Sequence, residues 1–242
     1  MTSPAPLREA ITGGDLPAML AGRSFLVVAE GGLFDVAEAS LIVADLHLEK
    51  GSSLARHGRL VPPYDSGATL AVLARMITRL MPRRVVCLGD SFHDGEGASR
   101  LGDEERRQLA HLQSGRDWLW VSGNHDPQPP AGVGGDFVTQ SALGPITLRH
   151  EPMAGRAVFE IAGHLHPAAR LRTRAGTLKR RCVASDGRRA VLPALGAYAG
   201  GLDLGHKAFS GLFDEKKLIA YMLDGGSIYP VALGRTRRAV AS

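Results

Sequence analysis

Three times in this chain a short apolar segment runs directly into a polar motif, and a helical pattern separates each segment from the next. The apolar segments cover residues 41–44, 85–88 and 118–121, and apolar residues recur at helical spacing over 66–80 and 103–113. This alternation predicts parallel strands with helices packed outside them. In such folds the carboxyl ends of the strands meet at one edge, where ligands bind. The sequence therefore predicts an α/β fold that gathers its polar motifs at that edge.

The second half of the chain has mostly strand patterns. A loop rich in proline and glycine follows Pro127, and short apolar runs come after it. Together with one run near the start, the expected strands are residues 24–28, 146–148, 158–161, the two sides of Asp186-Gly187, 219–222 and 228–233, with a short helix at 206–212. No repeat or long linker divides the chain, so we expect a single domain over residues 1–242.

Composition limits the classes of protein to which the chain can belong. With 242 residues, 44% hydrophobic and 22% charged, it can bury a sizeable core. A net charge of +5 favours an anionic partner, although enrichment in arginine, alanine and glycine is equally typical of a GC-rich genome. Cys87 and Cys182 make no disulfide framework. Without a leader or an apolar run near the roughly 20 residues of a membrane span, we expect a cytoplasmic protein.

The polar motifs together supply enough nitrogen and oxygen donors for two metal ions. They are Asp45-Leu46-His47, Gly89-Asp90, Gly123-Asn124-His125-Asp126, His150 and Gly163-His164-Leu165-His166. Carboxylates are hard oxygen donors, imidazoles are borderline nitrogen donors, and no cysteine takes part. This mixture suits Mn²⁺, Fe or Zn²⁺ in a hydrolytic centre better than a structural zinc clip. Each motif alone is weak, because glycine after a strand can serve only a turn, but their joint order favours a catalytic centre.

The spacing of the motifs suggests a role for each residue. Two divalent ions about 3–4 Å apart can hold a bridging hydroxide, polarise a phosphoryl oxygen and stabilise in-line displacement at phosphorus. We expect Asp45, His47 and His166 to hold the first ion, Asn124, His150 and His164 to hold the second, and Asp90 to bridge both. His125 is then left beside the phosphate. A histidine there can stabilise the transition state or protonate the leaving oxygen.

The ordered motifs between residues 40 and 166 resemble those of the calcineurin-like metallophosphoesterase superfamily. The resemblance implies an αββα sandwich with mixed sheets and a dinuclear site, with Mn²⁺ as a common activating ion and Fe, Zn²⁺ and Mg²⁺ as alternatives. Many members carry an aspartate three residues after the bridging aspartate, where it orients the catalytic histidine. Here that position is His93, followed by Asp94. Asp94 and Asp126 are therefore both candidates to orient His125.

A narrower resemblance extends over nearly the whole chain. Residues 41–50, 89–94, 150–152, 163–167 and 192–202 are similar to the bacterial subgroup of ligase-associated DNA damage response endonucleases called PdeM. Membership implies a phosphodiesterase acting on DNA, in repair, beside a ligase, a helicase and an exonuclease-like protein.

A basic segment follows His166 closely. It contains Arg170, Arg172, Arg174, Lys179, Arg180, Arg181, Arg188 and Arg189. These residues predict a positive rim beside the metals that attracts a DNA strand, with Arg172, Arg174, Arg180 and Arg181 as candidate contacts. The alternative is a solvated hairpin face. Few aromatic residues interleave the segment, which weakens a base-stacking interpretation.

Three classes of function fit these features. They are a nuclease or phosphodiesterase that cuts nucleic acid, a phosphatase or nucleotidase that acts on small phosphate esters, and a scaffold that kept the fold without catalysis. The complete ligand set and His125 argue against the scaffold. No long cap insertion is evident between the motifs, which favours an accessible polymer substrate. The expected activity is therefore metal-dependent hydrolysis of phosphodiesters in DNA.

Overall fold

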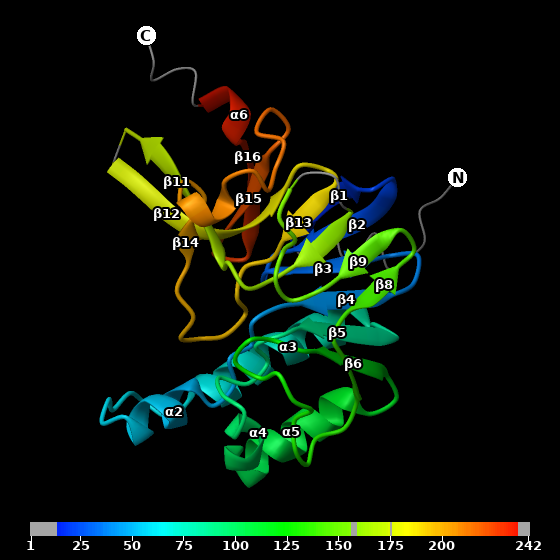
Figure 1. Cartoon of the computed structure of the whole chain (residues 1–242), viewed down its shortest axis with the longest axis vertical. Coiled ribbons are helices and arrows are strands. Elements are labelled where there is room, and N and C mark those ends of the chain that lie inside the picture. Colours follow the sequence, from blue (N-terminus) through cyan, green and yellow to red (C-terminus); the bar gives the residue numbers. More distant parts are fainter. Residues whose placement is uncertain (1–13, 156–158, 175, 237–242) are drawn as a thin grey trace.

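Two β-sheets pack face to face, and α-helices cover the outer face of one of them (Figure 1). This computed structural model describes residues 14–155, 159–174 and 176–236. Both sheets are mixed, as expected, and the α/β class is confirmed.

The first sheet holds the three repeated units. Its strands are β1 (Leu16–Leu20), β2 (Arg23–Val28), β3 (Gly32–Asp35), β4 (Ser40–Val43), β5 (Arg84–Leu88), β6 (Asp117–Val121) and β7 (Asp136–Val138), in that spatial order. The first four are antiparallel neighbours, and β4 to β7 are parallel. The apolar segments that precede the polar motifs are thus the adjacent parallel strands β4, β5 and β6, as predicted.

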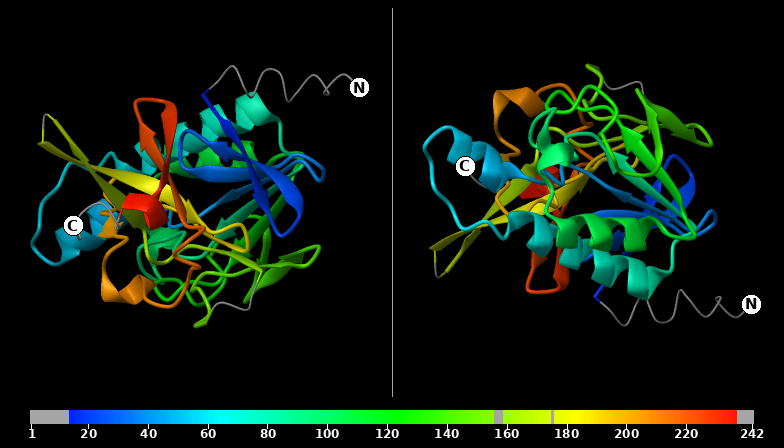
Figure 2. Two further views of the ribbon diagram at one scale, coloured as in Figure 1. Left: turned by 90° about the horizontal axis from the view of Figure 1, so that it is seen from above. Right: turned by 90° about the horizontal axis from the view of Figure 1, so that it is seen from below.

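The helices of the repeated units pack on the outer face of this sheet (Figure 2). The helices here are α2 (Lys50–Arg56), α3 (Asp65–Leu80), α4 (Gly97–Arg100) and α5 (Asp103–Gln113). In α3 the buried apolar residues follow the 3.6-residue period, and the helix ends at Leu80, with Met81 as its C-cap before Pro82. Three acidic residues in the first turn of α5 complement its helix dipole. Both long helices match the predicted ranges closely.

The second sheet lies on the inner face of the first. Its strands follow the order β14-β11-β12-β13-β10-β9-β8, while β15 pairs with β12 and β16. They are β8 (Ser141–Leu143), β9 (Ile146–Leu148), β10 (Glu160–Ala162), β11 (Pro167–Thr173), β12 (Gly176–Ser185), β13 (Arg189–Val191), β14 (Leu202–Asp203), β15 (Ile219–Asp224) and β16 (Ser227–Ala232). The expected strands and the hairpin at Asp186-Gly187 are present. The start of the segment predicted over 158–161, Val158, lies outside the described residues.

Apolar side chains fill the space between the sheets. Phe25, Ile42 and Val86 of the first sheet belong to the same buried cluster as Ile161 and Leu192 of the second. This core fixes the two sheets relative to each other, so it also fixes the loops at their edges.

An irregular segment covers the outer face of the second sheet. It contains a short 3-10 helix, η1 (Lys207–Phe209). A last short helix, α6 (Leu233–Thr236), follows β16. Phe209 and Phe213 pack there on a separate apolar cluster. The helix expected over 206–212 is therefore shorter than predicted, because Ser210 is extended, with a ψ of 129°, and Gly211 after it has a φ of 74°.

Both cysteines are buried and free. Among the described residues, no helix has the length and apolar character that crossing a membrane requires.

Candidate metal centre

The predicted ligands follow the carboxyl ends of strands in both sheets. Asp45 and His47 come after β4, Asp90 after β5, Asn124 after β6, His150 after β9, and His164 and His166 after β10. The strands β4 to β6 are parallel to one another, and so are β9 and β10. Their ends therefore meet at one edge of the sandwich, where these side chains form two adjoining clusters.

The first cluster consists of Asp45, His47 and His166, whose ligand atoms all lie within 4.8 Å of one another. The Nε2 atoms of the two histidines are 3.3 Å apart. Nε2 of His166 is also 3.2 Å from Oδ1 of Asp45. This is the group that the sequence assigns to the first ion.

The second cluster consists of Asp90, His150 and His164, joined by Asn124. Nε2 of His150 is 3.3 Å from Oδ1 of Asp90 and 3.2 Å from Nδ1 of His164. Oδ1 of Asn124 is 2.9 Å from the nearest nitrogen of each histidine. The structure thus groups the residues assigned to the second ion.

These separations fit ligands that share a metal ion. Nitrogen donors bonded at about 2.0–2.1 Å to a tetrahedral ion are about 3.4 Å apart. Oxygen donors bonded at about 2.0–2.1 Å to an octahedral ion are about 3.0 Å apart. The donor pairs in the two clusters are 2.9–3.3 Å apart. The residues therefore fit two divalent cations.

The hydrogen bonding of His150 supports the same conclusion. Its Nδ1 lies 2.8 Å from the Leu88 carbonyl oxygen, so Nδ1 carries the hydrogen and Nε2 of the neutral ring has a lone pair. That lone pair faces the Asn124 oxygen, which is also an acceptor. Burial lowers the pKa of His150, but Asp90 and Asp45 outweigh burial and raise it to about 9. Either a proton or a metal ion must therefore separate the two acceptors, and a metal displaces the proton.

The first cluster is preorganised in a different way. Burial, reinforced by the charge of His166, lowers the pKa of His47 to about 3. The ring is neutral at pH 7, which is the form that binds metals. Asp45 is fully buried, and Asp90 is 2% exposed. Buried carboxylates need a positive partner, and a bound cation supplies it.

Two motif glycines are required by close packing, not by backbone conformation. A Cβ atom on Gly163 would lie 2.4 Å from a carboxylate oxygen of Asp45. A Cβ atom on Gly123 would lie 2.2 Å from the backbone nitrogen of Asp90 and 2.5 Å from Oδ1 of Asp126. Neither glycine has a positive φ. Both glycines therefore let the loops approach the buried carboxylates, a role the turn interpretation did not include.

His125 lies beside the second cluster. Its Nδ1 forms a hydrogen bond, and its Nε2 has no acceptor within hydrogen-bond distance among the described residues. Its Nδ1 is 2.9 Å from the backbone oxygen of His93, to which it donates. Its Nε2 is 3.9 Å from Oδ2 of Asp90, and 41% of the side chain is exposed. The His93 ring stacks on it, with centroids 5.0 Å apart. His125 can therefore exchange a proton at Nε2 with a group bound at the metals.

The two carboxylates expected to orient His125 have other partners. Both oxygens of Asp94 accept hydrogen bonds from the Arg100 guanidinium, which holds the pKa of Asp94 at about 2. The carboxylate of Asp126 accepts backbone N–H groups of four residues, namely Asp90, Ser91, Phe92 and Gly123. It therefore fixes the loops after β5 and β6. A backbone carbonyl orients His125 instead, and a backbone group has no sequence signature.

Open grooves of about 480 and 500 Å³ border the clusters. The first reaches His166, and the second reaches Asn124 and His150. Arg149, which the sequence analysis did not single out, lines the second groove. Its only signal is its place directly before His150.

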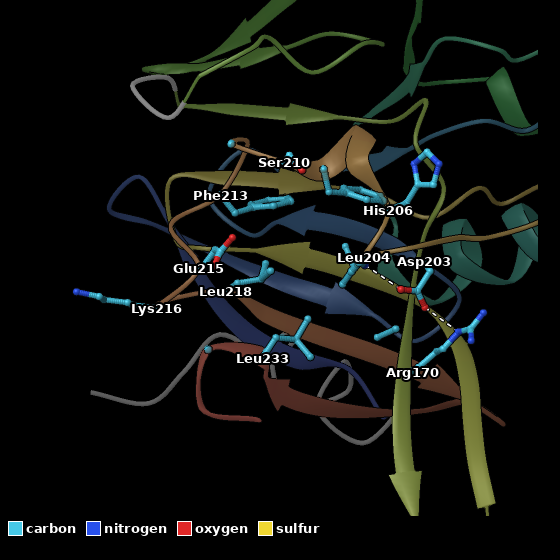
Figure 3. A pocket seen from close by; sticks show the side chains of 15 residues that line it. Arg170, Asp203, Leu204, His206, Ser210, Phe213, Glu215, Lys216, Leu218 and Leu233 are labelled. Carbon is cyan, nitrogen blue, oxygen red and sulfur yellow. Dashed lines mark hydrogen bonds and ion pairs between the residues drawn. The ribbon is translucent and has the colours of Figure 1, made fainter. Parts of the chain in front are cut away.

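A larger cavity of about 650 Å³ lies away from the metal clusters (Figure 3). Phe209, Phe213, Leu204 and Leu218 line its apolar part, and it contains none of the clustered ligands. Its size alone therefore does not make it the reaction site.

The basic residues after His166 divide into paired and unpaired groups. Arg189 is 1% exposed and pairs with Glu160, so its expected place in a surface rim is wrong. Arg170 pairs with Asp203, as Figure 3 shows.

Among the candidate DNA contacts, Arg180 pairs with Asp224. Arg172, Arg174 and Arg181 are exposed, and none forms an ion pair with a carboxylate among the residues that the structure describes, although Glu30 acts on Arg181 at longer range.

Comparison with known proteins identifies the fold. A crystal structure of Pseudomonas putida nuclease MPE matches with a TM-score of 0.69 at 23% identity, covering 90% of this chain and 100% of that chain. A phosphoesterase from E. coli, Yfce, matches with a TM-score of 0.38 at 17% identity, covering 80% and 98% of the two chains. No protein-family profile and no curated protein matches the sequence. At these identities the likeness to the first structure establishes the shared fold.

Proposed function

We propose that this protein is a metal-dependent phosphodiesterase that cuts DNA. The observation that carries the proposal is the juxtaposition of two metal-binding clusters with the exposed, hydrogen-bonded ring of His125. Two divalent ions in such a site supply an activated water and electrophilic stabilisation of the phosphoryl oxygens. The similarity of fold to a nuclease and the sequence resemblance to metallophosphoesterases support this reaction class.

Each residue has a defined part in this proposal. Asp45, His47 and His166 would hold one ion, and Asp90, Asn124, His150 and His164 would hold the other, with Asp90 also the carboxylate that the sequence assigns to both. His125 donates the proton at Nε2 to the leaving oxygen while His93 keeps Nδ1 occupied. Asp126 and Asp94 support the loops through their hydrogen bonds and do not touch the substrate.

A substrate with a chain on both sides of the phosphorus fits the surroundings of the site. One groove reaches His166 and a separate groove reaches Asn124 and His150, whereas a phosphate monoester has only one organic group to accommodate. Basic side chains border one of them. These features favour a phosphodiester in a strand over the alternative, a phosphatase or nucleotidase acting on small esters.

The sequence resemblance supports three narrower proposals. Mn²⁺ is the activating metal, in keeping with a donor set of carboxylate, amide and imidazole groups without thiolate. The protein belongs with the PdeM subgroup as a DNA repair endonuclease. It acts beside a ligase and a helicase, which affinity purification with defined, purified candidates tests.

The deciding experiment compares substrates under one set of conditions. The purified protein, stripped of metal and reloaded with Mn²⁺, is given bis-p-nitrophenyl phosphate, p-nitrophenyl phosphate, and single-stranded, nicked and duplex DNA. We expect Mn²⁺-dependent cleavage of the diester and of DNA. A kcat/KM for the monoester above those for both diesters would establish the phosphatase alternative. Absence of hydrolysis with Mn²⁺, Fe²⁺, Zn²⁺ and Mg²⁺ would overturn the proposal.

A further inference from the structure

The groove beside His166 has one wall made by the β11–β12 hairpin. This hairpin projects beyond the rest of the second sheet (Figures 1 and 2). Its Lys179, Arg180 and Arg181 line the groove, and the opposite wall comes from the loop of residues 193–201 and Val72 of α3. Because His166 lies in the same groove, a strand whose phosphate is bound at the metals can continue along this hairpin.

Although Arg180 is part of the groove lining, strand alternation and pairing separate its guanidinium from the other two cations. Side chains two apart on a strand share a face, so Lys179 and Arg181 lie on the face of Val183, which packs between the sheets. Arg180 lies on the opposite face with Cys182, in the outer cluster, and its Nε is 2.8 Å from Oδ1 of Asp224. Adjacent arginines therefore point to opposite sides of the sheet.

The two cations in the groove form no close ion pair with a described residue, although burial lowers the pKa of Arg181 and the more distant Glu30 carboxylate partly offsets that effect. Nζ of Lys179 donates to the Gly201 carbonyl oxygen at 2.7 Å, and Nη1 of Arg181 donates to the Ala194 carbonyl oxygen at 3.2 Å. Neither forms an ion pair with a carboxylate of the described chain. Carbonyl oxygens hold both side chains at the wall without neutralising them. The groove therefore presents two fixed positive charges next to the metal centre.

The groove beside Asn124 and His150 carries less positive charge. Its one arginine, Arg149, is partly committed, because its Nη2 donates to Gln140 and its Nε lies 3.6 Å from a carboxylate oxygen of Glu160. Glu151, which is 74% exposed at the side chain, adds a negative charge there. A polyanion is therefore attracted more strongly on the His166 side.

We propose that Lys179 and Arg181 form a phosphate-binding subsite for the part of the nucleic acid strand that flanks the cleaved bond. The proposal rests on the proposed function and assigns one flank of the strand to one groove. Two residues apart on an antiparallel strand, the cations are attached about 6.8 Å apart, so each can contact its own phosphate. Arg172 continues the same face toward the hairpin tip, while Arg180 takes no part.

The test measures kcat/KM on single-stranded oligothymidylate at several salt concentrations, divided by kcat/KM on bis-p-nitrophenyl phosphate. Each lost phosphate contact lowers the slope of log affinity against log salt by about 0.7 on a single strand. The double variant Lys179→Gln/Arg181→Gln should therefore lose about 1.4 from the slope. If the two proteins are equal at 1 M salt, this slope difference over the one decade down to 0.1 M lowers the ratio by a factor of 10^1.4, or about 25-fold.

Two controls separate a subsite from a structural effect. Arg180→Gln removes the neighbouring charge on the opposite face and should keep the wild-type slope. The double variant Lys179→Arg/Arg181→Lys keeps both charges, so it should also keep the wild-type slope. If the native side chains were needed for packing instead, this variant would lose the slope. A folding defect would show as loss of both activities and a lowered melting temperature.

The outcomes distinguish the subsite from the proposed function. If the wild type cleaves both substrates and the double variant Lys179→Gln/Arg181→Gln keeps the wild-type salt slope, the subsite proposal is wrong and the proposed function stands. An equal loss of slope in Arg180→Gln also overturns the subsite, because charge on either face would then suffice. No metal-dependent hydrolysis of either substrate by the wild type overturns the proposed function itself.

Discussion

Removing either partner of the buried pair Arg189–Glu160 should destabilise the protein strongly. Both side chains are 1% exposed, and Nε of Arg189 lies 2.5 Å from Oε1 of Glu160. The guanidinium also donates to the carbonyl oxygens of Leu212 and Met153. It thus ties β13 to segments distant in the chain. Breaking a buried pair leaves one charge without compensation, which typically costs about 3–5 kcal/mol in the free energy of unfolding.

The surroundings predict that the two single variants differ. In Arg189→Met, Glu160 keeps a second cation, because Nε of Arg149 is 3.6 Å from its Oε2, so the cost should lie near about 3 kcal/mol. In Glu160→Leu, two arginines lose their carboxylate, and the cost should reach about 5 kcal/mol. The double variant removes the stranded charge and should cost less than the sum of the single variants.

Urea unfolding followed by circular dichroism measures these differences. For a chain of this size about 3–5 kcal/mol also lowers the melting temperature by roughly 6–20 °C, at about 2–4 °C per kcal/mol. Additive losses in the double variant would refute the reasoning, because they would mean that the two residues do not interact. A loss below about 1 kcal/mol in Arg189→Met, with a reduced salt dependence of DNA cleavage, would return Arg189 to the surface rim.

Three further predictions concern the metal centre and the loops that carry it. Asp90→Asn should lose more bound metal and activity than His47→Ala, because only Asp90 is assigned to both ions; full occupancy by elemental analysis with normal turnover would contradict the site. His125→Ala should keep both ions and lose about 10²–10⁴ in kcat, whereas loss of metal would make it a ligand. Arg100 holds the pKa of Asp94 at about 2, below its usual 3.8. The ion pair therefore stabilises the folded protein fully above pH 3.8, and this stabilisation is lost as the pH falls from 3.8 through about 2. Asp94→Asn should therefore flatten the decline of urea midpoints below about pH 4, and an unchanged decline would exclude the pair.

The units that carry the ligands were predictable because the signals in them are local. Alternating apolar strands and helices indicated β4, β5 and β6 with α3 and α5, and a shared strand direction was enough to bring their carboxyl ends together. The short strands β1 and β3 were not predicted. β3 begins at Gly32, directly after Gly31, and β1 contains Pro17, and glycine and proline are typical of turns. Short strands are formed by pairing with neighbours, which local patterns do not encode.

Side-chain environments that depend on distant partners were harder to predict. Arg189 appeared to belong to the basic rim because Glu160, its partner, lies 29 residues away. The orienting group of His125 is the His93 carbonyl oxygen, which any residue at that position would provide. The opposite orientation of Arg180 and Arg181, however, follows from strand alternation alone. It was predictable once their strand had been recognised.

The backbone of the ligand loops explains why aspartate and histidine recur there at a spacing of two. Asp45, His47 and Glu49 all have positive φ, as do His164 and His166, and aspartate and histidine adopt this conformation more readily than most side chains. The alternation brings Asp45 and His47 into the first cluster and the intervening leucines into the core. This backbone costs about 1–2 kcal/mol per residue, or roughly 3–6 kcal/mol over the first three.

Burial of the residues in between offsets that cost. Leu46 and Leu48 are fully buried in the core beneath the first sheet, and each contributes about 1.5–3 kcal/mol. Their sum, roughly 3–6 kcal/mol, matches the conformational cost of the loop. The leucines of the Asp-Leu-His-Leu segment are therefore as necessary as its ligands, because without them the strained backbone that points Asp45 and His47 at the metal would relax.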